Sequence, residues 1–435
     1  MALGGGTFTA QNKVLPGSYI NVVSTARASA ALSDRGVAAV ALSLPYSPSG
    51  VFEVTNETLV NDSLAVFGCD YGSETLRPLR EILLNAQKVY VYNTSDAGTK
   101  ASNTYATAKY AGTGGNSISV RIEADVDNTS NYIVSTLMGN IVVDEQSVAK
   151  TGKTTALAAN DYVDWKTEVD LTETAGASMT GGTTAGNSGT VSQQNALNAF
   201  EAYTFNVITI AHASSTGHSM VKSYVNRLRN EQGIKIQGVV YNTDADDEGI
   251  INVVTAAAEQ DYAMIFWVAG AAAGCALNRS LTNKVYDGEY TPVVDETQSE
   301  LEGYIQDGKF AFHKVGDDIR VLMDINSLKT TTAEKGDIFK ENQVVRVADQ
   351  IANDIAVIFN TKYIGAVQNN ATGRALFKAD IIQHHNQLQD MNAIEDFTAD
   401  SVTIEAGTEK GAVVVTDAIT VVGTMTKLYM TVYVL

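Results

Sequence analysis

The sequence predicts a chain of several domains: a mixed α/β core, an inserted antiparallel β domain, a C-terminal α+β domain, and an extended strand arm at each end. Three observations support this prediction. Predicted strands and helices alternate on both sides of a middle segment that is rich in Thr, Ser, Asn and Gly. Runs of β-forming residues lie near both termini. At 435 residues the chain also exceeds the size that one hydrophobic core usually supports.

Residues 1–18 are predicted to form an N-terminal arm. A run of three glycines, residues 4–6, precedes the β-forming residues 7–14, which have no nearby segment with which to form a hairpin. The alternative is an ordinary frayed terminus.

The α/β core is predicted to be discontinuous, formed by residues 19–92 and 196–308. Short apolar runs predict strands, and apolar residues at helical spacing predict helices. The strands are expected at 19–23, 36–42, 64–68, 88–92, 205–211, 235–241 and 263–268, and the helices at 76–85, 191–203, 217–231 and 269–277. Residues 250–259 fit either a strand or a short helix.

Residues 93–195 are predicted to be an inserted outer β domain. Their composition shifts sharply to polar residues and Gly, with alternating runs at 117–123 and 132–137. Closely spaced strands with polar turns are typical of a small antiparallel sandwich or barrel. The Gly- and Thr-rich residues 179–187 are expected to be the exit linker.

Residues 309–426 are predicted to form the C-terminal α+β domain. Its expected elements are a hairpin of 310–315 and 319–325, helices at 342–367 and 372–391, and strands at 401–405 and 412–422.

The last segment, 427–435, is predicted to be a C-terminal strand arm. Strand alternation would place Leu428, Met430, Val432 and Val434 on one face, and Tyr429, Thr431 and Tyr433 on the other. An apolar strand of this kind either closes a sheet of its own chain or pairs with another subunit.

Composition and charge exclude several classes of function. The chain carries 30 basic and 49 acidic residues, a net charge of −19, which disfavours binding to a phosphate backbone or an anionic membrane surface. The two cysteines, Cys69 and Cys275, are too far apart in sequence to indicate a disulfide framework or a metal site. No export signal is visible at residues 1–6, so we expect a cytoplasmic protein.

The motifs that carry chemistry are incomplete. Lys150–Thr155 resembles the end of a phosphate loop, but Ser147 stands where the loop needs glycine. The histidines and serines between 212 and 219 lack a catalytic constellation and fit a helix cap better. His384 and His385 are adjacent, so on a helix they point about 100° apart and cannot bind one metal as an i, i+4 pair would. Asp244–Gly249 lacks the ligand spacing of a calcium loop. The sequence therefore predicts no enzyme, no cofactor and no metal site.

Two stretches of the chain resemble the contractile tail sheath proteins of phages, R-type bacteriocins and prophage-like particles, especially those of Gram-positive bacteria. They are residues 15–21, LPGSYIN, and residues 267–284, WVAGAAAGCALNRSLTNK. The likeness continues through Tyr286, Asp287 and Gly288 into the C-terminal helices and is weakest over 93–195.

This resemblance implies a structural subunit that forms stacked hexameric rings around an inner tube protein and contracts from a metastable extended state to drive the tube through a target envelope. It implies strand exchange between neighbouring subunits, with partners at the baseplate and the tail terminator, assembly in the bacterial host cytoplasm, and a place in a phage tail or a released particle. The C-terminal domain would face the tube. The residues expected to serve in the arms are Thr7, Phe8, Thr9, Val14, Leu428, Tyr429, Met430, Val432 and Val434, and those expected to contact the tube are Lys362, Arg374 and Lys378.

Two alternatives remain open from the sequence. One is another self-assembling shell or surface-layer protein, which would form sheets or closed shells in place of tubes. The other is a secreted hydrolase or adhesin, suggested by the Thr- and Asn-rich β segment, which would require an export signal.

Overall fold

The computed structural model describes residues 32–434, except 96, 185–189 and 212–213. Its described residues divide into two compact units. We call Asp354–Gln387 with Phe397–Ala418 the hairpin unit, and Ser33–Asn353 with Leu388–Asp396 and Ile419–Leu435 the main unit. The strand expected at 19–23 and the N-terminal arm lie outside the described residues.

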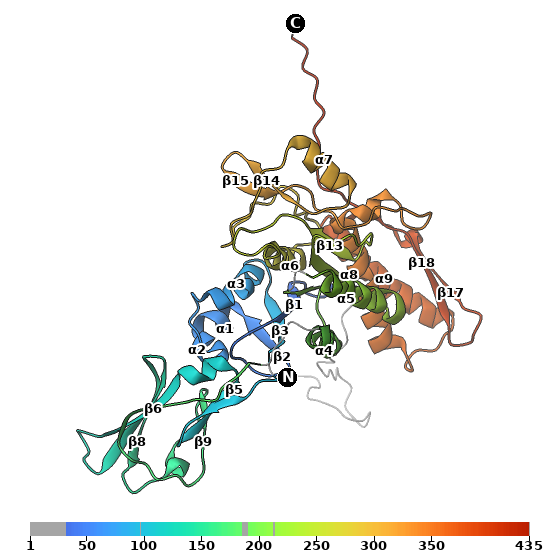
Figure 1. The fold of residues 1–435 in the computed structure, drawn as a ribbon. Helices are drawn as coiled ribbons and strands as arrows, with labels where there is room; N and C mark the ends of the chain where they lie inside the picture. The colour runs from blue at the N-terminus through green and yellow to red at the C-terminus, as the bar shows by residue number, and fades with distance from the viewer. Residues whose placement is uncertain (1–31, 96, 185–189, 212–213, 435) are drawn as a thin grey trace, which may run out of the picture. The chain divides into compact units, whose positions relative to one another are not determined.

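A six-stranded sheet forms the centre of the main unit (Figure 1). Its order is β13 (Ile250–Val253), β12 (Gln237–Tyr241), β11 (Val207–Ile210), β1 (Val37–Leu42), β3 (Lys88–Asn93) and β2 (Val51–Thr55). The neighbours pair in parallel, except that β2 is antiparallel to β3. Val40 pairs with Val91 of β3 on one side and with Thr209 of β11 on the other. One sheet therefore contains strands from both sides of the β-rich segment, and the predicted strands at 36–42, 88–92, 205–211 and 235–241 are confirmed.

Helices cover both faces of this sheet, which explains its continuous apolar strands. Alternate residues of β1 enter different cores: Ala38 and Val40 pack with helix α6, and Ala39 and Ala41 pack with helices α4 and α5. Helices α4 (Thr190–Phe200) and α5 (Ser215–Arg227) confirm the predictions at 191–203 and 217–231. The π-helical turn η4 (Leu228–Gln232) extends α5, and 250–259 begins with the strand β13.

Helix α6 (Met264–Gly274) overturns the predicted strand at 263–268. Ten of its residues, Met264 through Ala273, are buried, so it has no polar face and no helical periodicity to read from sequence. It packs against α3 (Arg77–Leu83), which confirms the helix expected at 76–85.

The strand predicted at 64–68 is also wrong, because Ser63–Phe67 forms the short helix α2. Gly68 ends this helix in the left-handed conformation, with φ of 68°, which glycine adopts without steric cost. The preceding helix α1 (Asn56–Asn61) starts at a capping box in which Thr55 and Thr58 satisfy each other's backbone N–H groups.

The β-rich segment contains two antiparallel sheets around a separate apolar core. One has the order β10 (Thr174–Ser178), β6 (Ile118–Ala124), β7 (Asn131–Met138) and β8 (Ile141–Ala149). The other has the order β4 (Lys100–Ser102), β5 (Ala106–Ala111) and β9 (Val163–Trp165). The strands predicted at 117–123 and 132–137 are confirmed as β6 and β7.

The rest of the main unit holds helix α7 (Gln298–Gln306), the antiparallel hairpin of β14 (Phe312–Val315) and β15 (Asp318–Val321), and the pair β16 (Ile394–Glu395) and β19 (Thr420–Val421). The hairpin expected at 310–325 is therefore confirmed. Helices α8 (Asn342–Ile358) and α9 (Ala371–Asp390) each contribute residues to both units.

The hairpin unit adds the π-helical turn η6 (Phe359–Tyr363) and the strands β17 (Val402–Ala406) and β18 (Val413–Asp417). Residues 364–367, predicted to continue the first helix, are not helical, because the chain turns before α9. The second predicted helix, 372–391, is confirmed as α9. Within the described ranges, no helix combines the length and the apolar character needed to cross a membrane.

Candidate assembly surfaces

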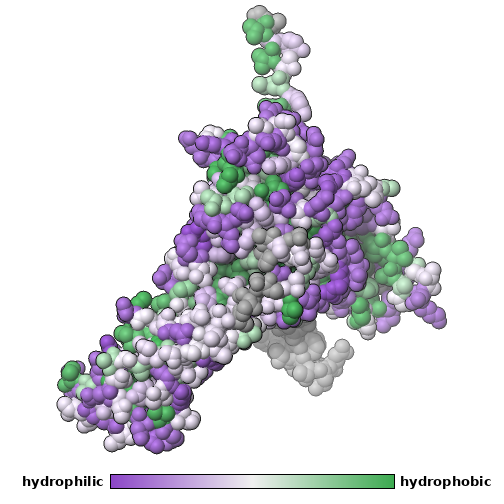
Figure 2. All heavy atoms as spheres, viewed as in Figure 1, coloured by the Kyte–Doolittle hydropathy of each residue, from purple (hydrophilic) through white to green (hydrophobic). Residues whose placement is uncertain are grey.

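The C-terminal arm is extended and exposed. Residues 423–434 belong to no described strand or helix, and Figure 1 draws them as a trace leading to the C-terminus. Tyr429 is 89% exposed and Val434 is 93% exposed, and Figure 2 shows apolar side chains along this trace. Single exposed apolar residues are ordinary, but a contiguous run of them marks an interaction surface.

The arm leaves the main unit at a defined point. The backbone N–H of Val422 donates to the carbonyl oxygen of Ala393 at 3.1 Å, and the side chain of Gln343 donates to the carbonyl oxygen of Val422 at 2.9 Å. The N–H of Thr424 donates back to Gln343 at 3.3 Å. The chain is thus fastened up to Thr424, and the predicted arm residues Leu428, Tyr429, Met430, Val432 and Val434 follow it. The other predicted arm residues, Thr7, Phe8, Thr9 and Val14, lie outside the described residues.

The hairpin β17–β18 presents sheet edges in the hairpin unit. In the described part of the chain each strand pairs with the other alone, from Val402 opposite Asp417 to Ala406 opposite Val413. Val414 is 53% exposed, and Figure 2 shows apolar residues gathered where Figure 1 draws the two strands. A two-stranded hairpin is marginally stable by itself and its edges are templates for a further strand.

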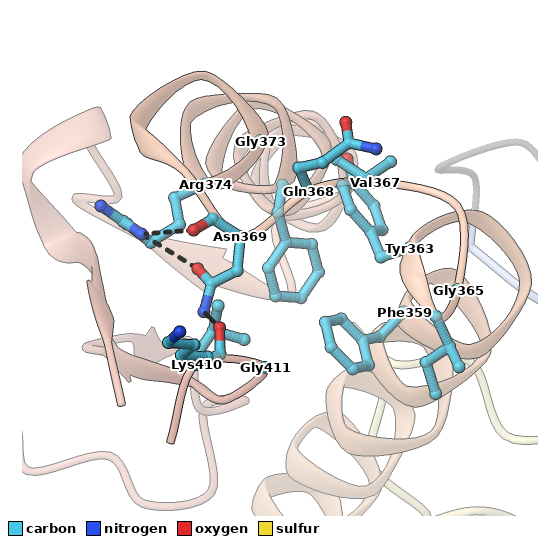
Figure 3. A pocket seen from close by; sticks show the side chains of 13 residues that line it. Phe359, Tyr363, Gly365, Val367, Gln368, Asn369, Gly373, Arg374, Lys410 and Gly411 are labelled. Carbon is cyan, nitrogen blue, oxygen red and sulfur yellow. Dashed lines mark hydrogen bonds between the residues drawn. The ribbon is translucent and has the colours of Figure 1, made fainter. Parts of the chain in front are cut away.

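A hollow of about 440 Å³ lies beside the start of β18 (Figure 3). Its wall is an aromatic cluster: the rings of Phe359 and Tyr363 stack with centroids 6.1 Å apart, and the Phe377 ring lies 5.2 and 4.8 Å from them. Ile364 and Val413 add aliphatic surface. We call this site the aromatic hollow.

Polar groups form the rim of the aromatic hollow. The side-chain amide of Asn369 donates to the carbonyl oxygens of Lys410 and Ala412 at 3.0 and 2.7 Å, and thereby ties the turn before α9 to the turn before β18. The Arg374 guanidinium donates to Asn369 Oδ1 at 2.9 Å, as the dashed lines in Figure 3 show. Arg374 and Lys410 line the hollow, and no carboxylate does.

The three predicted tube-contact residues lie in different surroundings within the hairpin unit. Lys362 is half-buried and pairs with Asp380 at 3.2 Å, and the Tyr363 hydroxyl donates to the same carboxylate at 2.7 Å. Arg374 is on the rim of the hollow. Lys378 is half-buried on α9, one position after Phe377.

The adjacent histidines of α9 are fully buried and each has its own acidic partner. His384 Nε2 lies 2.9 Å from Asp354 on α8, and His385 Nε2 lies 2.8 Å from Asp417 at the end of β18. His385 Nδ1 lies 3.0 Å from the carbonyl oxygen of Ile381, one turn earlier in α9. The pair therefore fixes the hairpin strand and α8 to α9, a role that adjacent positions in a sequence do not reveal.

The other incomplete motifs have structural roles. Ser214 accepts the N–H of Gly217 at 3.2 Å and caps α5. Lys153 of the phosphate-loop-like stretch pairs with Glu168 at 2.9 Å. In the acidic turn, Asp246 accepts backbone N–H groups from 329 and 330, which lower its pKa to about 2. Among the described residues, no three side chains of His, Cys, Asp or Glu are grouped as metal ligands.

Sequence reasoning missed a buried acidic network around Glu81. This residue of α3 is fully buried; Oε2 accepts the Tyr286 hydroxyl at 3.0 Å, and Oε1 accepts the backbone N–H of Glu289. Arg80 forms a bidentate pair with Glu289, at 2.6 Å for both contacts. The network fastens the loop that holds residues 286–290 to α3. At helical spacing Glu81 lies opposite Leu79 and Leu83, so nothing in the sequence marks it as a buried residue.

Comparison with protein families gives three consecutive matches. Residues 96–187 match the phage tail sheath protein beta-sandwich domain, 186–327 the phage tail sheath protein central domain, and 334–435 the phage tail sheath C-terminal domain.

Individual relatives agree with these matches. The chain is 31% identical to protein XkdK of the phage-like element PBSX of Bacillus subtilis (strain 168), with 99% of each chain covered. A tail sheath protein of the Clostridium phage phiCD119 is 27% identical, over 50% of this chain and 61% of its own.

Solved structures show the same fold. The sheath tail protein from Desulfitobacterium hafniense superposes with a TM-score of 0.76 at 32% identity, covering 90% of this chain and 93% of that one. The sheath tail protein from Listeria innocua gives a TM-score of 0.78 at 28% identity and the same coverage. The helical sheath of the anti-feeding prophage in its contracted state gives 0.57 at 12% identity, covering 97% and 99%, and shares the fold.

Proposed function

Because the chain belongs to the phage tail sheath family, we propose that it polymerises as stacked hexameric rings around an inner tube and contracts to drive that tube through a target envelope. Membership itself makes the protein a structural subunit of a tail or a phage-like particle. Membership of this family favours a sheath subunit over the surface-layer, hydrolase and adhesin alternatives.

The observation that carries the proposal is the exposed apolar arm. Residues 425–434 expose most of their side chains, and the hairpin β17–β18 has edges that no described strand covers. Exposed strand edges and exposed apolar strands both favour pairing between chains. We expect residues 427–435 of one subunit, and residues 7–14 in the same way, to add strands to the hairpin of a neighbour by β-augmentation.

The energy for contraction comes from subunit contacts. Apolar burial contributes about 25 cal/mol per Å², so about 300 Å² of extra contact per subunit would release about 7 kcal/mol. Summed over many subunits, this drives contraction without nucleotide hydrolysis. The arms keep neighbours linked while the other contacts change.

Tube contact is assigned to the hairpin unit and α9. Lys378 is the first candidate for contact with an acidic tube. The other two are Lys362, which pairs with Asp380, and Arg374 on the rim of the aromatic hollow, which would serve the tube only where no arm occupies the hollow. The baseplate and the tail terminator would bind the two ends of the sheath, and assembly would take place in the bacterial host cytoplasm.

Electron microscopy of the purified chain, alone and with its tube protein, tests the proposal. We expect hollow striated cylinders with six-fold symmetry, and their loss when residues 1–15 or 427–435 are deleted. Val126→Ser is the matched control, because it removes an apolar side chain that is 90% exposed in the β-rich segment and should leave the cylinders intact. Monodisperse monomers under every condition would refute the proposal.

A further inference from the structure

The aromatic hollow sits where a strand added to β18 would place side chains. Val413, the first residue of β18, lines the hollow, and Lys410 and Gly411 of the preceding turn complete that side. Side chains alternate between the faces of a strand, so Val413 and Val415 share one face with Asp417, which contacts His385 of α9. This face of β18 is therefore directed toward the helix, and a neighbouring strand would project alternate side chains in the same direction.

The lining of the aromatic hollow fits a phenol better than an aliphatic side chain. Phe359, Tyr363 and Phe377 offer ring faces and edges for an aromatic guest. Arg374 and Lys410 are on the rim with no lining carboxylate. An aliphatic guest would cover these cations without giving them an acceptor, whereas a tyrosine hydroxyl accepts a hydrogen bond from either.

The C-terminal arm carries two tyrosines, whose phenol side chains fit the lining of the aromatic hollow. Tyr429 and Tyr433 lie on the same face of the extended arm, four residues and about 13 Å apart. They are 89% and 84% exposed. In a polymer of identical subunits, every neighbour presents an arm of this sequence.

We propose that the aromatic hollow is a docking site for the tyrosine face of the C-terminal arm of a second copy of this chain. This inference rests on the proposed strand exchange and adds its anchor: one tyrosine ring packs against the wall formed by Phe359, Tyr363 and Phe377, and its hydroxyl accepts from Arg374 or Lys410. The tyrosine face points inward, and Leu428, Met430, Val432 and Val434 point away from the hollow.

Photo-crosslinking in the full chain tests this orientation. p-Benzoylphenylalanine is placed at 429, 430, 432 or 433 in separate preparations, and each is mixed with ¹⁵N-labelled chain carrying the same substitution before assembly and irradiation. Crosslinks between ¹⁴N and ¹⁵N chains must come from two copies. We expect them from 429 or 433 to the peptide that contains residues 359–377, and not from 430 or 432.

Point variants with a matched control complete the test. Ile364 is 60% exposed and lines the hollow, and Ile338 is 64% exposed and does not. Ile364→Arg should lower the yield of the crosslink at least tenfold, and Ile338→Arg should leave it unchanged, with circular dichroism confirming that both variants fold.

The possible failures are distinguishable. Crosslinks between copies that reach only the edge of β17 or β18, or that reach the hollow from 430 or 432, would overturn the tyrosine anchor and leave strand exchange standing. If the tube protein occupies the hollow and the arm crosslinks to another site, the tyrosine anchor is likewise overturned and strand exchange still stands. Absence of any crosslink between copies in assembled material would overturn the strand exchange itself.

Discussion

At the residue scale, the protonation of Glu81 affects the stability of the fold. Desolvation by burial raises the pKa of its carboxyl to about 7 from the ordinary 4.5, because the hydrogen bonds from Glu289 N–H and Tyr286 only partly replace water. Between pH 4.5 and 7 the folded chain therefore holds a proton at this site that the unfolded chain has released.

This proton has a calculable effect on stability. Since the folded state binds more protons than the unfolded state, the free energy of unfolding falls as pH rises from about 4.5 to about 7 and the loss is complete above pH 7. The loss attributable to Glu81 is about 3 kcal/mol. Glu81→Gln cannot ionise, so wild type should lose about 3 kcal/mol relative to this variant across that range.

Denaturant titrations at pH 4.5, 6 and 8 measure the difference. Glu334→Gln, an exposed carboxyl removed elsewhere in the main unit, is the control and should track wild type at all three pH values. If wild type and Glu81→Gln keep a constant difference across the range, Glu81 is ionised in the folded state at low pH and the argument from burial is wrong.

At the element scale, the packing of α6 on α3 depends on two glycines. A Cβ atom at Gly270 would lie 2.1 Å from the carbonyl oxygen of Ile82, and one at Gly274 would lie 1.9 Å from that of Asn85. Backbone cannot yield as a flexible side chain can, so α6 would have to move away from α3. The pair of glycines in the stretch 270–274 is therefore a requirement of close helix contact.

Gly270→Ala should destabilise the chain by at least about 2 kcal/mol, because overpacking separates two buried helices. Gly303→Ala is the control: its Cβ would meet nothing within 4 Å, and in the interior of α7 the exchange should stabilise by about 0.5–1 kcal/mol. Thermal unfolding of both variants measures the two effects. Equal midpoints for Gly270→Ala and wild type would contradict the packing argument.

Prediction from sequence succeeded where elements are amphipathic or flanked by turns and failed where they are not. The strands at 36–42 and 88–92 were recoverable because turn residues bound them, and the helix at 342–358 because its apolar residues recur at helical spacing. The helix at 264–274 was not, because burial on all sides removes the period. Gly68 was a visible C-cap signal for the helix at 63–67 that the apolar run 64–67 obscured.

The candidate site was predictable only in part. The alternation of residues 427–435 marks an arm in the sequence, and the structure places these residues, up to 434, in an exposed, extended segment. The aromatic hollow was not predictable, because Phe359, Phe377 and Lys410 meet only after two helices and a hairpin turn have folded. Pairs such as His385 with Asp417 depend on the same tertiary contacts.

At the scale of the whole molecule, net charge opposes assembly. Each copy carries −19, so neighbouring subunits repel one another through solvent. The Debye length falls from about 30 Å at 0.01 M salt to about 8 Å at 0.15 M, which screens repulsion between copies while leaving apolar contacts intact. The fraction of polymer should therefore rise with ionic strength over this range.

Sedimentation of the chain at a series of salt concentrations measures the polymer fraction. Potassium chloride and sodium chloride should act alike if screening is the cause. A polymer fraction that falls as salt is added would indicate that ion pairs between subunits, and not apolar contacts, hold the assembly together.

The chain passes from the central sheet to the β-rich segment and back through two stretches that pair with each other. Thr99 and Thr183 pair with each other in an antiparallel bridge, and Ser102 pairs with Thr180 just beyond it. The segment leaves after β3 and returns before α4, and its own core is separate from both cores of the six-stranded sheet. The two stretches are thus a natural graft point: a foreign domain with closely spaced termini could replace residues 100–182 and be carried by every copy of the chain in the particle.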